Sequence, residues 1–83
     1  MKKYLVDVYI PAAGEHLDAF LPANKQIGEV VSLLVEIAVP LSGNSFERTA
    51  DTVLINAVDG GVYDFNTTVF DAGIRNSTKL ILI

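Results

Sequence analysis

Near its start the chain reads Lys3-Tyr4-Leu5-Val6-Asp7-Val8-Tyr9-Ile10, and the interpretation of the whole sequence begins from this stretch. Every second residue is apolar and lies on one face, which is the period of a β-strand with one buried side. The residues of that face are Tyr4, Val6, Val8 and Ile10. A turn signal follows at 11–14, and Leu17, Ala19 and Leu21 then alternate in the same way. The short gap between the two stretches predicts a β-hairpin.

A helix is predicted over about Lys25 to Ala38, with Asn24 as its N-cap. Pro40 predicts the end of the helical region, because the residue before a proline is disfavoured in the α conformation. Glu29, Ser32 and Glu36 form a narrow polar stripe, with Leu33 beside it. The apolar residues that fall at helical spacing on the opposite face are Ile27, Val30, Val31, Leu34 and Ile37.

The second half of the chain predicts three further strands. Thr52 to Val58 is rich in β-forming residues, and Val62 to Phe65 reads as a short fourth strand. Asp59-Gly60-Gly61 separates them, because a tight hairpin turn needs positive φ, which glycine adopts without strain. Lys79 to Ile83 is an almost wholly apolar closing strand, as expected for a strand in the middle of a sheet.

The predicted order is therefore β-β-α-β-β-β. This order indicates an α+β protein in which one helix packs across a mixed sheet of four to five strands. The first and last strands are the most apolar, so we place them side by side at the centre, where their separation in sequence permits parallel pairing. This is the β-grasp arrangement. With 83 residues and no repeat or linker, residues 1–83 are expected to form one domain.

Composition excludes several classes of function. The chain has no Cys and one His, so neither a disulfide nor a Cys- or His-rich metal site is expected, and no cofactor is implied. A net charge of −4 makes nucleic acid an unfavourable partner. The apolar run after Lys3 is broken by Asp7 and stopped by Pro11, and the stretch from Val30 to Leu41 is too short to span a bilayer. A cytoplasmic protein that does not insert into membranes is the expectation.

The last third of the chain resembles ubiquitin-like folds. It reads Val69-Phe70-Asp71-Ala72-Gly73-Ile74-Arg75-Asn76-Ser77-Thr78-Lys79-Leu80-Ile81-Leu82, an apolar residue followed by Asp, Gly-Ile, a polar turn and an alternating strand. Asp71 is expected to bond nearby backbone N–H groups, Gly73 to take a positive φ, and Ile74 to fill the core below the helix.

Within ubiquitin-like proteins, the chain is similar to the small YukD/EsaB family of Gram-positive type VII secretion systems. The similarity implies an accessory or regulatory role in secretion, exercised by binding cytosolic parts of a membrane complex. A related domain forms the cytosolic head of an actinobacterial type VII membrane component, so an interaction module of a larger membrane protein is the alternative. Ubiquitin and the sulfur carriers end in Gly-Gly, whereas the Gly60-Gly61 pair here is internal. Conjugation or carrier chemistry would require a longer native tail.

No catalytic residue is predicted. His16 and Asp18 share a strand face, which could suggest a general base with its orienting carboxylate, but no Ser or Cys nucleophile accompanies them. A solvated strand face is the simpler interpretation, and we expect no enzymatic activity.

The apolar surplus is the feature that predicts a function. Mean hydropathy is +0.40, high for a small domain, and exposed apolar side chains mark contact surfaces. If Leu80 and Leu82 face the helix, Ile81 and Ile83 face away from it. The alternation in the third strand leaves open whether Leu54 or its neighbours point outward. We predict a protein-binding surface around Leu54, Ile81 and Ile83, with Leu33 and Val35 on the outer helix as a second candidate. Such a face also allows weak self-association.

Overall fold

The computed structural model describes residues 2–83. It contains strands β1 (Lys3–Ile10) and β2 (Glu15–Pro22), helix α1 (Ile27–Leu41), and strands β3 (Leu54–Asn56) and β4 (Lys79–Leu82). The sheet order is β2-β1-β4-β3. The first and last strands pair in parallel at its centre, and the two outer pairs are antiparallel. This is the ubiquitin-like β-grasp fold that the sequence predicts.

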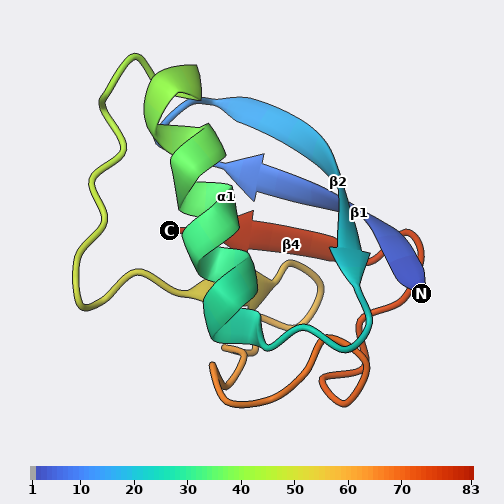
Figure 1. Ribbon diagram of the computed structural model, residues 1–83. Helices are drawn as coiled ribbons and strands as arrows, with labels where there is room; N and C mark the ends of the chain where they lie inside the picture. The colour runs from blue at the N-terminus through green and yellow to red at the C-terminus, as the bar shows by residue number, and fades with distance from the viewer. Residues whose placement is uncertain (1) are drawn as a thin grey trace.

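Helix α1 lies across one face of the sheet, and the long segment between α1 and β3 loops around the edge of the molecule (Figure 1). The core fills the space between helix and sheet. All four residues of the predicted β1 face are at most 3% exposed. The other core residues come from α1, from β3 and β4, and from the segment between those two strands: Ile27, Val30, Val31, Leu34, Val35, Ala38, Leu54, Val69, Ile74, Leu80 and Leu82.

The start of the helix differs from the prediction. Asn24 is not the N-cap; Gln26 occupies that position, and its side chain makes no capping hydrogen bond. The first helical N–H groups instead donate to backbone carbonyls of the segment before β4, Ile27 to Thr67 at 2.8 Å and Gly28 to Phe65 at 3.0 Å. Because tertiary contacts satisfy these donors, no side-chain cap is needed. At the other end Pro40 is accommodated in the last turn, and the helix ends at Leu41.

The predicted fourth strand, Val62 to Phe65, is wrong. Val62 forms a single isolated bridge to Ile55. The backbone bonds there run from Tyr63 N–H to Leu54 O and from Asn56 N–H to Gly61 O, after which Asp64 starts a new turn. The chain leaves the sheet edge at this point and passes under the start of α1. The observed order is therefore β-β-α-β-β, and β3 covers only the middle of the predicted 52–58 strand.

The segment before β4 largely follows its predicted chemistry. Gly73 has φ +82°, and Ile74 is fully buried. The side-chain role predicted for Asp71 is taken by Thr68. The Thr68 hydroxyl accepts a hydrogen bond from the Asp71 backbone N–H and so stabilises this turn. Asn76 Oδ1 then accepts a hydrogen bond from the Leu5 N–H at 2.9 Å, which ties this turn to the start of β1.

Candidate functional site

The register of the sheet determines which side chains share its outer face, the face away from α1. Ile55 on β3 lies opposite Ile81 on β4, and Ile81 lies opposite Tyr9 on β1. Val53 and Ile83 exchange two backbone hydrogen bonds next to this row, at 2.9 and 3.1 Å. Since paired residues lie on the same face of a sheet, these five side chains are neighbours.

We call this set the outer apolar patch: Tyr9, Val53, Ile55, Ile81 and Ile83. Ile83 is 48% exposed, and the other four are partly exposed. Leu80 and Leu82 are buried against the helix, so Ile81 and Ile83 face outward as the sequence analysis required. Contiguous partly exposed apolar side chains are the surface type that ordinarily marks a protein contact.

Leu54 does not belong to this surface. Its side chain is fully buried, because its register partner is Leu82, which also points to the helix. Ile55 takes the outward position that the sequence analysis left open between the two faces. The prediction that Leu54 contributes to a binding surface is therefore wrong.

The two residues of the helix candidate differ in exposure. Leu33 is 49% exposed, but Val35 is buried at 9% and belongs to the core. Ile37, predicted for the core face, is instead 43% exposed. The apolar stripe of α1 is therefore wider than the surface that the sheet covers. Leu33 and Ile37 lie beside β2 rather than on the outer apolar patch, and the predicted candidates fall on two separate surfaces.

Polar groups border the outer apolar patch on the β1–β2 side. Asp7 Oδ1 lies 3.1 Å from His16 Nδ1, and the His16 ring lies 4.7 Å from that of Tyr9. The carboxylate that contacts His16 is therefore Asp7 and not Asp18, which the sequence analysis had paired with it. Among residues 2–83, no cluster of three or more His, Cys, Asp or Glu side chains could hold a metal ion.

One ionisable group that packs against the core has a shifted pKa. Burial raises the pKa of the Tyr63 phenol above its ordinary value, and the negative charge of Asp59 acts in the same direction. A hydrogen bond from Asn56 Nδ2 to the phenol oxygen, at 3.0 Å, partly opposes the increase. Since Tyr63 stays protonated over the physiological range, it provides a fixed hydroxyl beside β3.

Comparisons with known proteins agree with this fold. The EccD5 ubiquitin-like domain of Mycobacterium xenopi superposes with a TM-score of 0.78 at 16% identity, over 100% of this chain and 94% of that one. The ubiquitin-like domain of the Mycobacterium tuberculosis type VII secretion protein ECCD1 gives 0.68 at 18% identity, over 100% and 99%. Caldiarchaeum subterraneum ubiquitin gives 0.77 at 16% identity, over 99% and 92%. No protein-family model matches the sequence, and no curated protein matches it.

At these identities the similarity establishes the ubiquitin-like fold. No helix within residues 2–83 combines the length and apolarity required to cross a bilayer.

Proposed function

We propose that this chain is a non-catalytic ubiquitin-like accessory domain of a type VII secretion system, and that it acts by binding a protein through the outer apolar patch. The observation that carries the proposal is the in-register row of Ile55, Ile81 and Tyr9, extended by Val53 and Ile83. Burying such a row on a partner removes apolar area from water at about 25 cal/mol per Å².

The secretion context has two supports. The closing segment resembles the YukD/EsaB family, and two of the solved structures with this fold are ubiquitin-like domains of mycobacterial EccD proteins. The partner we propose is a cytosolic part of a membrane secretion complex, which places the domain in the cytoplasm as an adaptor or regulator. The EccD similarity also favours a second candidate, an interaction module within a larger membrane component.

The test is affinity capture from lysate of the host, with captured proteins identified by mass spectrometry. Wild type is compared with Ile81→Glu, which places a charge at the centre of the outer apolar patch. Val58→Asp is the matched control, because Val58 is 85% exposed and lies outside the patch. Circular dichroism establishes that both variants fold.

We expect type VII secretion components with wild type and Val58→Asp, and their loss with Ile81→Glu. Capture of those components by all three proteins would refute the role of the patch. Capture of none of them by folded wild type would refute the role in secretion.

A further inference from the structure

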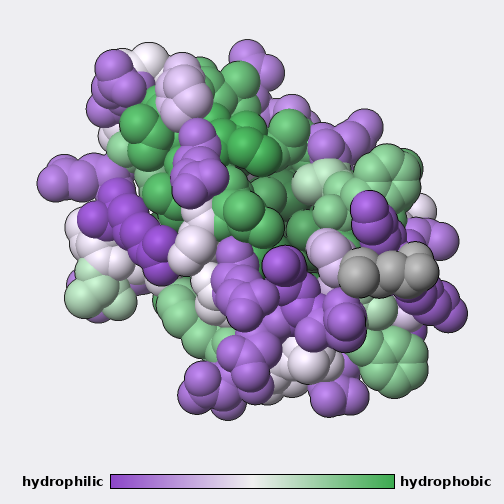
Figure 2. Space-filling view, in the orientation of Figure 1, coloured by the Kyte–Doolittle hydropathy of each residue, from purple (hydrophilic) through white to green (hydrophobic). Residues whose placement is uncertain are grey.

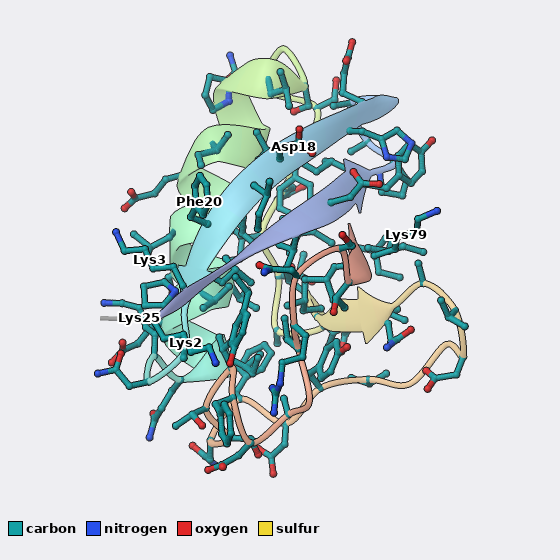
Figure 3. The ribbon with its side chains drawn as sticks, turned by 90° about the vertical axis from the view of Figure 1, so that its right-hand side faces the viewer. Lys2, Lys3, Asp18, Phe20, Lys25 and Lys79 are labelled. Atoms are coloured by element: carbon teal, nitrogen blue, oxygen red, sulfur yellow. The ribbon has the colours of Figure 1, made fainter. Side chains whose placement is uncertain are left out.

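A row of charged side chains borders the outer apolar patch on the same face of the sheet. In the register, Asp18 on β2 lies opposite Asp7 on β1, and Asp7 lies opposite Lys79 on β4. We call these three residues the charge row. Tyr9 and Ile81 follow Asp7 and Lys79 by two positions on the same strands, so the charge row and the patch share one face. Figure 3 shows Asp18 and Lys79 on the two sides of β1.

The apolar part of this face extends past the patch. Val62 forms an antiparallel bridge to Ile55, so its side chain lies on the same face, and it is 61% exposed. An apolar row therefore runs across the strands from Tyr9 to Val62, parallel to the charge row. Figure 2 shows a different apolar area, over α1 and the strand beside it, which lies on the helix side of the sheet.

The size of an ordinary protein interface brings the charge row under the partner. Such an interface removes about 800 Å² of surface from each protein. The domain has an accessible surface of 4805 Å², so the interface would occupy about one sixth of it. Four of the five side chains of the outer apolar patch are only partly exposed, and they supply a small part of that area. A partner that binds this face therefore covers the charge row as well.

Two like charges stand close together in the charge row. The Ala23 N–H donates to the Lys2 carbonyl at 2.8 Å, so these two residues form a hydrogen-bonded pair. Hydrogen-bonded and non-bonded pairs alternate along antiparallel strands, so Asp7 and Asp18 form a non-bonded pair, in which the side chains approach closely. Like charges directly opposite each other destabilise a strand pair. A cation between the two carboxylates would remove this repulsion.

Only one of the two carboxylates has cationic neighbours. The Asp7 carboxylate contacts His16, and Asp7 lies opposite Lys79 in the register. Within residues 2–83 the ion pairs are His16 with Asp7 and Lys25 with Glu29, and neither involves Asp18. Covering an unpaired carboxylate with protein costs desolvation free energy unless a cation accompanies it. The partner has to bring that cation.

We propose that the protein segment that covers the outer apolar patch carries an arginine, and that this arginine binds between Asp7 and Asp18. The proposal rests on the proposed function and specifies the chemistry of its partner. A guanidinium suits this pair better than an ammonium, because its five N–H donors lie in one plane and can reach two carboxylates at once. Apolar residues next to the arginine cover Tyr9 and Ile81.

A second copy of this chain is a poor source of the arginine. The chain has two arginines, and both are engaged in their own fold. Arg48 Nη1 donates to Ser32 Oγ at 3.0 Å. The Arg75 guanidinium lies 4.1 Å from the centroid of the Phe70 ring and donates to the carbonyls of Phe70 and Ile74. The charge of the site therefore favours a different protein as the partner.

The test uses ¹⁵N-labelled protein and NMR with two peptides. The first is acetyl-Gln-Leu-Arg-Leu-Leu-Gln-amide, and the second has citrulline in place of arginine, which keeps the shape of the side chain and removes its charge. We expect saturable shifts of the Ile55, Ile81 and Asp18 amides with both peptides. The arginine peptide is expected to bind about fivefold more tightly than the citrulline peptide.

Two variants assign this preference to the charge row. Asp18→Asn removes the charge and keeps the shape of an exposed side chain, and we expect it to abolish the fivefold preference for arginine. Asp51→Asn is the matched control, because Asp51 is exposed in the segment between α1 and β3 and the net charge changes equally. We expect it to keep the preference.

Equal affinity of the two peptides for wild type would overturn the arginine proposal and leave the outer apolar patch as the binding surface. Loss of the preference in Asp51→Asn as well would also overturn it, because net charge alone would then explain the result. A doubled mass in sedimentation for wild type, and a single mass for Asp18→Asn, would identify a second copy as the occupant and overturn it too.

A different pair of results would overturn binding through the patch itself, and with it both proposals. These results are the absence of amide shifts with either peptide at millimolar concentration, or shifts centred on Leu33 and Ile37 in place of Ile55 and Ile81.

Discussion

Replacing Leu54 with Ala tests the assignment of the two faces of β3. Leu54 is fully buried and pairs with Leu82, whereas the adjacent Ile55 points to the outer face. Leu→Ala removes three carbon atoms from the core, worth about 2.4 kcal/mol at roughly 0.8 kcal/mol per CH₂. The cavity left behind brings the expected loss to about 3–4 kcal/mol, within the range of about 2.7–5.0 measured for buried leucines.

That loss is large for a domain of this size. An 83-residue protein is expected to have a total stability of about 4–12 kcal/mol. A loss of about 3 kcal/mol corresponds to a Tm lower by about 12–24 °C. The assay is thermal and urea unfolding followed by far-ultraviolet circular dichroism, because the chain has no Trp.

Ile55→Ala is the matched control, one position along the same strand. It removes a partly exposed side chain, and we expect it to cost about 1 kcal/mol or less. Equal losses for the two variants, or a larger loss for Ile55→Ala, would contradict the register of β3 and with it the composition of the outer apolar patch.

Three further measurements test local features of the fold. Gly73→Ala is expected to destabilise by about 1–2 kcal/mol, because φ there is +82° and a side chain is strained in that conformation; unchanged urea unfolding would contradict this. Gly28→Ala is expected to stabilise by about 0.5–1 kcal/mol, since the position is helical and the new Cβ would contact Phe65 at an ordinary 3.4 Å; a lower unfolding midpoint would show that Phe65 cannot accommodate it. Tyr63 has a raised folded pKa, so its contribution to stability is complete below the unfolded pKa of about 10 and is lost as pH rises through the folded value. Tyr63→Phe should therefore lose less stability than wild type between about pH 9 and 11, and parallel pH profiles would refute the assignment.

Much of the fold could be predicted because it depends on local chemistry. The alternation from Tyr4 to Ile10 predicts one buried face, and all four residues of that face are in the core. Gly73 adopts the predicted positive φ, and Ile74 is buried as predicted. Both predictions depend on the residue type at a single position. The first and last strands were predicted at the centre because they are the most apolar, and they pair there; their parallel direction, which the sequence only permitted, is set by the structure.

The candidate surface could be predicted only in part. Ile81 and Ile83 were correctly placed on the outer face, because the buried partners Leu80 and Leu82 alternate with them. Whether they bind a partner stays a prediction. Leu54 was misplaced because apolar residues occupy both faces of its strand. The alternation of side chains therefore does not show which of the two faces points to the core.

Several features were decided only by contacts between distant segments. The Phe65 and Thr67 carbonyls cap the helix in place of a side chain, and a single bridge replaces the predicted fourth strand. The β2 edge is open because of the strand order, and the groove beside Leu33 forms where β2 and α1 meet. Local sequence determines which residues prefer strand, helix or turn, since those preferences act over a few bonds. Which of two apolar faces is buried, and which edge stays open, depends on partners tens of residues away, and only the packed chain decides between them.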